Sequence, residues 1–467
     1  MEEFTARVLV FDSDPDQRLR IIGRLGDRGY SNLIARSVDE ALDIARNNQL
    51  DSIIVNASAP KKEQEALSAA LKDLWETRHL PIILIGGDED GNQPLDERDA
   101  ALADFLPKEF HDLKLFSHLS SLVRLKTMQS ELERRLATTV EFGGVAPKLV
   151  QPPRSIRGAE VLAVACTGDE RKLADAALGR TTKVNHRCGY GAALKQIVSG
   201  DPDAIIVALD GNDEEGLQFF SETRSNSRFF NTPLVLITDA RDHTDPVAPY
   251  MTGANDVIPP SVNVKDLRTR VTALIKQRLY RESMRELYLQ LGDDITAYRL
   301  TGLYTHGFLY AHLARQLEDA NRWNKNIAVG YIDVEEMVEF NEVYGPVAGD
   351  FLLRELGALI GGLVRGEDLV ARVSGEEFCV VKPDTTHDIA EFALERIVGV
   401  IGNTEFRLPK IDHGVKVNLT VGHASLQPGD NPEDLIARAR EVCKLNRRTT
   451  LRQPKRRAML PTTSDDA

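Results

Sequence analysis

The sequence predicts three successive α/β domains: two with doubly wound parallel sheets, then one with a central, mostly antiparallel sheet. Three observations support this. Short apolar runs alternate with amphipathic helical patterns over the first part of the chain, as in parallel sheets covered by helices. A strand turns back through Gly375, as in an antiparallel hairpin. A length of 467 residues is a prior for about three domains.

The first domain contains apolar runs at residues 7–11, 52–55 and 81–85. In parallel sheets, functional residues gather at the carboxyl ends of the strands, here Asp12 and Asn56. This pattern resembles the flavodoxin-like receiver domain of response regulators. The resemblance implies that Asp12 is a weak metal ligand and that Lys108 takes the place of the family's lysine. It puts Asn56 at the phosphoacceptor position, and an amide cannot form the acyl phosphate.

Two further departures weaken phosphorylation chemistry in this domain: Ser13 replaces a second acid, and Gly86 replaces the switch hydroxyl. The pattern then repeats, with runs at 160–166, 203–208 and 232–238. This second receiver-like domain has Ala208 at the acceptor position, which cannot be phosphorylated. It has Cys166 among the lost acids and Pro259 in place of the lysine, and only Thr238 is retained. We interpret both domains as docking or adaptor folds, although an atypical phosphoacceptor remains open.

The third domain contains the segment RGEDLVARVSGEEF at 365–378, preceded by LTGL at 300–303. Asn341 and Asp350 follow Asp333 by eight and seventeen residues. These elements resemble the GGDEF domain family of diguanylate cyclases, which join two GTP into cyclic di-GMP. The resemblance implies that Asn341 and Asp350 recognise guanine. It implies a Mg²⁺ site at Asp333, Val334 and Glu376.

Several residues that the family uses for the reaction are replaced. Val338 stands for a lysine, Pro346 for a histidine and Tyr298 for an aspartate. Phosphoryl transfer depends on cations around the triphosphate, so these losses predict a degenerate site in which Glu376 and Glu377 are vestigial. Ser374 replaces the first glycine of the signature, at a tight hairpin where a missing side chain permits a positive φ. A serine can be tolerated at this position. No cofactor is then required, and Mg²⁺ binds only together with a nucleotide.

The inhibitory RxxD pattern of the family is retained at Arg365 and Asp368, and Arg396 stands at the place of the family's second arginine. A guanidinium can bind a guanine edge through two hydrogen bonds and stack on a base. The resemblance therefore implies a cyclic di-GMP site at Arg365, Asp368 and Arg396. The alternative is an exposed salt bridge between Arg365 and Asp368, which would contribute little.

Composition limits the classes of function. A net charge of −13 argues against general binding to nucleic acid or to anionic membranes. The four cysteines lack metal-binding spacing, and we expect reduced, buried thiols in a cytoplasmic protein without a membrane span. The predicted boundaries are 1–138 for the first receiver-like domain with its extended last helix, 139–156 for a linker, 157–292 for the second with its connecting helix, 293–450 for the GGDEF-like domain and 451–467 for a flexible tail.

These features favour a cyclic di-GMP effector over an enzyme. The order of domains resembles PleD-type response regulators of two-component systems, and this implies homodimerisation through the receivers. The degenerate signature with a retained RxxD implies, by resemblance only, recruitment of partners such as a proteolysis adaptor in the cell cycle, and polar localisation. A slow diguanylate cyclase, a nucleotide-independent dimeric scaffold and a GTP sensor remain alternatives.

Overall fold

The computed structural model describes residues 6–452 except 13, 57–65, 68, 71–79, 87–102, 108–109, 165–166, 209–213, 227–228, 230, 239–247, 292–295, 410 and 412. The described chain forms two compact units. Unit 1 contains residues 131–148 and 288–467, and unit 2 contains 6–130 and 149–287. Of the predicted flexible tail, residues 451–452 are helical instead, at the end of a helix that runs to Arg452, and residues 453–467 lie outside the described residues.

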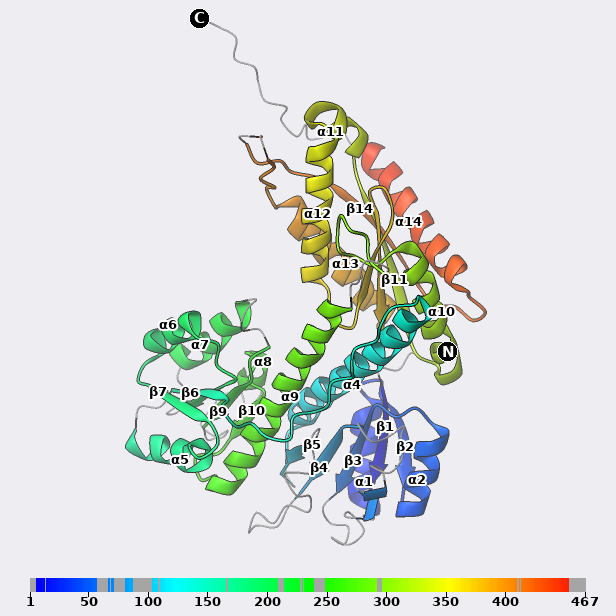
Figure 1. Ribbon diagram of the computed structural model, residues 1–467. Coiled ribbons are helices and arrows are strands. Elements are labelled where there is room, and N and C mark those ends of the chain that lie inside the picture. The colour runs from blue at the N-terminus through cyan, green and yellow to red at the C-terminus, as the bar shows by residue number, and fades with distance from the viewer. Residues whose placement is uncertain are drawn as a thin grey trace, which may run out of the picture. The chain divides into compact units, whose positions relative to one another are not determined.

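Unit 2 contains two five-stranded sheets, each wholly parallel (Figure 1). The first has the order β2-β1-β3-β4-β5. This order is flavodoxin-like, as predicted for a receiver-like domain. Its strands are β1 (Arg7–Phe11), β2 (Ser31–Ala35), β3 (Ser52–Asn56), β4 (Ile82–Ile85) and β5 (Ala103–Leu106), and its helices include α1 (Pro15–Gly26), α2 (Val38–Asn47) and α4 (Asp112–Glu141).

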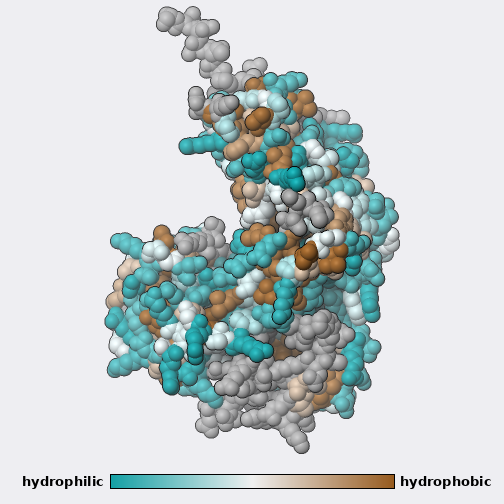
Figure 2. All heavy atoms as spheres, viewed as in Figure 1, coloured by the Kyte–Doolittle hydropathy of each residue, from teal (hydrophilic) through white to brown (hydrophobic). Residues whose placement is uncertain are grey.

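The second sheet has the order β10-β9-β8-β6-β7, which repeats the first topology. Its strands are β6 (Glu160–Val164), β7 (Lys183–Arg187), β8 (Ala204–Ala208), β9 (Leu234–Ile237) and β10 (Asp256–Ile258). Its helices are α5 (Gly168–Leu178), α6 (Tyr190–Ser199), α7 (Glu214–Ser225), α8 (Ala248–Met251) and α9 (Val264–Gln290). On the face seen in Figure 2, hydrophilic side chains predominate over this domain.

Buried ion pairs join the two receiver-like domains within unit 2. The Asp256 carboxylate lies 2.6 Å from Lys114 Nζ, on α4, and 3.2 Å from an Arg270 Nη. Burial alone would raise the pKa of Asp256, but the two cations lower it to about 2. Because removing one partner leaves a buried charge uncompensated, this contact fixes how the two domains dock.

The third domain lies in unit 1 and has the antiparallel sheet order β12-β13-β11-β14. The mostly antiparallel sheet predicted from the sequence is confirmed. Its strands are β11 (Ile327–Val334), β12 (Leu369–Ser374), β13 (Glu377–Pro383) and β14 (Leu419–Ser425). Its helices are α10 (His306–Trp323), α11 (Met337–Tyr344), α12 (Pro346–Leu363), α13 (His387–Gly402) and α14 (Pro432–Arg452).

Successive side chains of β11 enter two different cores, because side chains alternate along a strand. Val329 and Tyr331 pack in one cluster with residues of α10 and α14. Ile332 and Val334 pack in the other with residues of α12 and α13. Helices therefore cover both faces of this sheet (Figure 1). The sheet positions the residues of the candidate site at its edges and hairpin.

Two further expectations were tested by the described residues. Cys379 and Cys443 are buried free thiols, as expected, but Cys188 is exposed, so the prediction of buried thiols is wrong there. Cys188 directly follows β7, whose outer position leaves the turn open to solvent. None of the described helices is long and apolar enough to cross a membrane.

Candidate nucleotide-binding sites

In the first receiver-like domain, Asn56 lies at the end of β3 and contacts Asp12, at the end of β1. Asn56 Nδ2 donates to Asp12 Oδ2 at 2.7 Å and to Gln17 Oε1 at 2.6 Å. The other Asp12 oxygen, Oδ1, accepts from the Asp14 main-chain N–H at 2.8 Å. The Asn56 amide thus binds one oxygen of the Asp12 carboxylate at the strand end. Lys108 and Ser13 lie outside the described residues.

In the second receiver-like domain, Ala208 ends β8, Thr238 follows β9 and Pro259 follows β10. These positions converge at the carboxyl edge of the sheet, as the resemblance implied. None of the three side chains is a carboxylate or an amine, so this part of the edge offers neither a metal ligand nor a phosphoryl acceptor of the family's kind. Cys166 lies outside the described residues.

The hairpin of the third domain brings the candidate Mg²⁺ ligands together. Asp333 on β11 pairs in register with Glu377 on β13. The Val334 main-chain N–H donates to the Glu376 carbonyl at 3.3 Å. Asp333 Oδ1 is buried and has no hydrogen-bond partner among the described residues. Asp333, Glu376 and the Val334 carbonyl therefore retain part of a hard-cation donor set, and a bound Mg²⁺ would neutralise triphosphate charge there.

Two arginines of α14 compete for these carboxylates. Arg447 Nη1 lies 2.8 Å from Asp333 Oδ2, and Arg440 Nη2 lies 2.8 Å from Glu377 Oε1. Ser374 Oγ donates to Glu377 Oε2 at 2.5 Å. Burial raises the pKa of Asp333, opposed by Arg447, and Glu377 raises it further. An ion pair thus takes one Asp333 oxygen that the family's metal would use.

The signature turn accommodates the serine. Gly375 adopts φ 39°, while Ser374 is absent from the described non-glycine residues with positive φ. The strand pairing is irregular between Arg372 and Ser374, just before the turn. A glycine is still present where left-handed backbone is needed, so the serine is accommodated without strain.

The predicted guanine ligands lie on consecutive helices. Asn341 is on α11, and its Oδ1 would lie 1.9 Å from a Cβ added at Gly349, next to Asp350. Asn341 Oδ1 is buried without a hydrogen-bond partner among the described residues. The substituted positions nearby are apolar: Val338 is 65% exposed, and Pro346 begins α12. Asn341 and Asp350 thus remain candidate guanine ligands, and the two substituted positions, Val338 and Pro346, supply no cation.

The RxxD segment forms the turn between α12 and β12. The Arg365 main-chain N–H donates to Asp368 Oδ2 at 3.0 Å, which closes the turn. The Arg365 side chain is exposed. Arg396, exposed on α13, donates through Nη2 to the Leu363 carbonyl at 2.6 Å. Both arginines therefore lie beside the same turn, and two guanidinium groups face solvent there.

Asp368 is buried rather than exposed, and it is only 4% accessible. Its Oδ2 lies 2.5 Å from Lys382 Nζ, on β13. The exposed salt bridge with the Arg365 side chain, considered as an alternative, is therefore not the arrangement of this turn. Asp368 Oδ1 is buried and has no hydrogen-bond partner among the described residues. The carboxylate fixes the turn and keeps one acceptor atom unused.

Arg135, near the end of α4, contacts the RxxD turn. Arg135 Nη2 donates to the main-chain carbonyls of Glu367 at 2.8 Å and Asp368 at 2.7 Å. Its guanidinium lies 4.4 Å from the centre of the Tyr288 ring, near the end of α9. Arg135 is buried, so these contacts are shielded from water. Sequence reasoning missed Arg135 because it lies more than 230 residues from its partners and belongs to no local motif.

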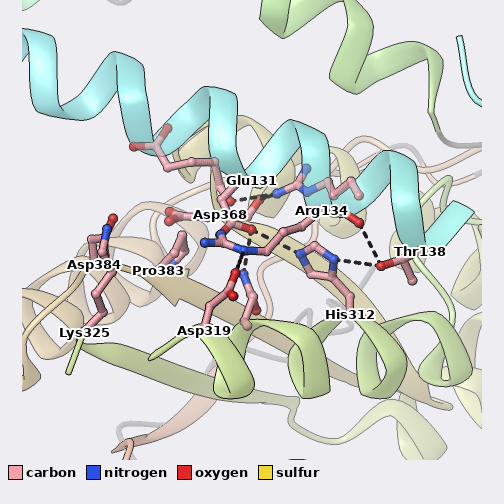
Figure 3. A network of polar contacts seen from close by, with 12 residues as sticks. Glu131, Arg134, Thr138, His312, Asp319, Lys325, Asp368, Pro383 and Asp384 are labelled. Atoms are coloured by element: carbon pink, nitrogen blue, oxygen red, sulfur yellow. Dashed lines mark hydrogen bonds and ion pairs between the residues drawn. The ribbon is translucent and has the colours of Figure 1, made fainter. Parts of the chain in front are cut away.

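A second buried network joins α4 to α10 (Figure 3). Glu131 Oε2 accepts from Gln316 Nε2 at 2.7 Å and from His312 Nε2 at 3.2 Å. Glu131 also pairs with Arg134, whose Nε lies 2.7 Å from Asp319. Burial alone would raise the pKa of Glu131, but Arg134 and His312 lower it to about 2. The carboxylate is therefore ionised and forms the centre of the network.

This network predicts a pH dependence of stability. Burial lowers the pKa of His312 from its ordinary 6.5, although Glu131 opposes this effect. Protonation of His312 thus favours the unfolded chain. The stability that neutral His312 contributes is fully present above pH 6.5, and it decreases as the pH falls below 6.5, by at most about 1.4 kcal/mol per pH unit. We expect His312→Gln to flatten the slope of unfolding free energy between pH 7 and 5.5. An unchanged slope would contradict the assignment.

Comparisons with known proteins bear on the third domain and on the order of the domains. Residues 298–452 match the family model "Diguanylate cyclase, GGDEF domain". The fold and this match therefore define a class of protein in which a GGDEF domain follows two receiver-like domains along the chain. The chain is similar along its length to the response regulator PleD of Caulobacter vibrioides, with 27% identity over 442 residues that cover 94% of this chain and 96% of PleD. The chain is thus similar along its length to a response regulator, and its third domain matches the GGDEF family model.

Two further similarities are confined to part of the chain. Over 82 residues, 18% of this chain and 19% of the relative, it is 40% identical to the diguanylate cyclase TpbB of Pseudomonas aeruginosa. A crystal structure of the GGDEF domain of DgcB from Caulobacter crescentus in complex with cyclic di-GMP covers 34% of this chain and 90% of its own, at 22% identity and a TM-score of 0.33.

Proposed function

We propose that this protein is a cyclic di-GMP effector that binds the dinucleotide through Arg365, Asp368 and Arg396 and does not synthesise it. The observation that carries the proposal is the contrast between two faces of one domain. At the RxxD turn, two exposed arginines flank a structured loop. At the signature hairpin, the Asp333 and Glu377 carboxylates are paired with arginines.

The chemistry of the RxxD turn suits a guanine dinucleotide. Two guanidinium groups can donate paired hydrogen bonds to guanine edges and stack on the bases. The unused Asp368 Oδ1 can accept from a guanine nitrogen once the turn opens slightly. Calorimetric titration of cyclic di-GMP into nucleotide-free protein tests this. We expect saturable binding in the micromolar range or tighter, about −8 kcal/mol or more favourable.

The contacts of Arg135 supply a route from this turn to α4. Ligand that shifts the carbonyls of Glu367 and Asp368 changes the acceptors of Arg135. The helix end is then biased toward one of its arrangements, by no more than the difference in ligand affinity between them. This supports a role in which ligand binding is passed to surfaces that recruit protein partners.

The partner-recruiting role rests on resemblance. Two degenerate receivers, a degenerate signature and a retained RxxD resemble PopA, a noncatalytic paralogue of PleD, which implies a proteolysis adaptor as partner, a link to the cell cycle and polar localisation. Homodimerisation through the receiver-like domains belongs to the same proposal. A nucleotide-independent scaffold is the competing reading, and it predicts that assembly is the same with and without cyclic di-GMP.

A slow cyclase is the second candidate, favoured by the unpartnered Asp333 Oδ1 and Asn341 Oδ1. Incubation with GTP and Mg²⁺, followed by chromatography of the nucleotides, separates the two. We expect no cyclic di-GMP above the level formed by Glu376→Ala, because Arg447 occupies Asp333 and the surrounding cations are replaced. Product that depends on Glu376 would establish the cyclase. Bound but unconverted GTP would indicate a GTP sensor.

A further inference from the structure

A cluster of two histidines and a glutamate lies on the third domain and shares no residue with either nucleotide site. His387 is the first residue of α13, Glu391 lies one turn further on the same helix, and His423 is on β14. Their possible ligand atoms all lie within 4.8 Å of one another. Among the described residues, this is the one group of three or more His, Cys, Asp or Glu side chains whose possible ligand atoms lie this close together.

The backbone explains why these side chains meet. Residues four apart on a helix share a face, so His387 and Glu391 project together. His423 is paired in register with Gly330 on β11. A Cβ added at Gly330 would lie 2.6 Å from Leu394 of α13, so the missing side chain lets the helix approach the sheet closely. The approach brings the start of α13 over the outer strand β14.

The distance between the two imidazoles fits a shared metal ion. His387 Nε2 and His423 Nε2 are 3.2 Å apart. Zinc binds histidine nitrogen at about 2.0–2.1 Å, and two such ligands at a tetrahedral angle lie about 3.3 Å apart. A direct hydrogen bond between neutral rings gives a similar distance, so the spacing has to be judged with the remaining groups.

Two further groups favour a metal. Ser425 Oγ lies 3.4 Å from His387 Nδ1, where it can accept the Nδ1–H and leave Nε2 as a lone-pair donor. Histidines that bind metals usually have such a partner on the other ring nitrogen. Glu391 adds a carboxylate as a third ligand for a metal ion. A hydrogen bond between the two imidazole rings would not require this carboxylate.

We propose that His387, Glu391 and His423 form a Zn²⁺ site that ties the first turn of α13 to β14. Two imidazoles and one carboxylate suit Zn²⁺ and related transition metals better than Mg²⁺ or Ca²⁺, which prefer oxygen ligands. Three protein ligands leave a fourth position for water or for a group from another molecule. The site is independent of cyclic di-GMP binding and of the signature hairpin.

Metal binding to the full-length, tag-free, chelator-treated protein tests the proposal. Zn²⁺ is titrated in competition with a chromogenic chelator, and Co²⁺ absorption reports the coordination geometry. We expect one equivalent of competed Zn²⁺, tetrahedral Co²⁺ bands and a higher melting temperature with Zn²⁺. Glu391→Gln and His423→Ala should each weaken Zn²⁺ binding by about 100-fold or more, and Ser425→Ala by about 10-fold.

Matched controls separate this site from other ligands. His413→Ala removes another exposed histidine of the domain, and Cys188→Ser removes the exposed thiol. Both variants should still bind one equivalent of Zn²⁺. Since Glu391→Gln preserves size, its loss of binding with an unchanged metal-free melting temperature excludes misfolding as the cause. Retained one-equivalent binding in His387→Ala/His423→Ala, or no competed Zn²⁺ in the unaltered protein, would overturn the proposal.

Discussion

Arg365→Ala is expected to weaken cyclic di-GMP binding by at least about 100-fold. Each hydrogen bond to a charged group contributes about 1.5–3 kcal/mol, and two such bonds to one guanine edge are lost together. About 1.4 kcal/mol corresponds to a tenfold change in affinity, which gives the estimate. The exposed Arg365 side chain closes no buried contact of the turn, whose shape depends on its main-chain N–H. Stability should therefore be unchanged.

The matched controls for this measurement are two other arginines. Arg322→Ala removes an exposed arginine of α10 and should bind the ligand like the unaltered protein. Arg396→Ala removes the second guanidinium beside the turn and should weaken calorimetric affinity by about tenfold or more. Equal affinities for the unaltered protein and Arg365→Ala, with saturable binding in both, would place the ligand elsewhere.

Glu131→Ala is expected to destabilise unit 1 by about 3–5 kcal/mol, because it leaves buried cationic and polar partners unpaired. Glu131 and His312 are both 0% exposed, and Glu131 is the shared partner of Arg134, His312 and Gln316. The free energy is measured from the urea unfolding transition of the third domain, followed by a probe within that domain because a chain of several domains need not unfold in one step.

The control for Glu131→Ala is Glu141→Ala, at the exposed end of the same helix. Glu141 pairs with Arg315, and both side chains are about half exposed. Exposed pairs contribute about 0–1 kcal/mol, so this variant should unfold at nearly the same urea concentration as the unaltered protein. Similar losses for the two variants would show that the network is not what holds α4 against the third domain.

Local patterns carried most of the fold prediction. The apolar runs of β1, β3 and β8 predicted parallel sheets, because the length and burial of a strand depend on residues that are neighbours in the sequence. The motif likewise predicted that adjacent antiparallel strands bring Asp333 and Glu376 together, and Glu376 lies in the turn directly before β13, which pairs with β11. These relations need only short stretches of chain. The positions of Asn56 and Ala208 at strand ends followed from the same argument.

Contacts between distant segments could not be predicted in this way. Lys382 lies 14 residues after Asp368, on the neighbouring strand, so strand pairing was the signal available to find it. Arg135 has no such signal, because its partners depend on how the end of α4 docks. The pairing of Arg447 with Asp333 depends on the placement of α14. His387 and His423 meet only because α13 lies close to Gly330.

The central claim is that cyclic di-GMP acts at the RxxD turn and not at the signature hairpin. Hydrogen–deuterium exchange with and without the dinucleotide tests the location directly. We predict protection of residues 363–368 and 392–396, with a change in 131–141 through Arg135, and no change in 333–341 or 374–377. Protection confined to the hairpin and to Asn341, with none at the RxxD turn, would contradict the account. It would favour the alternatives of a slow cyclase or a GTP sensor.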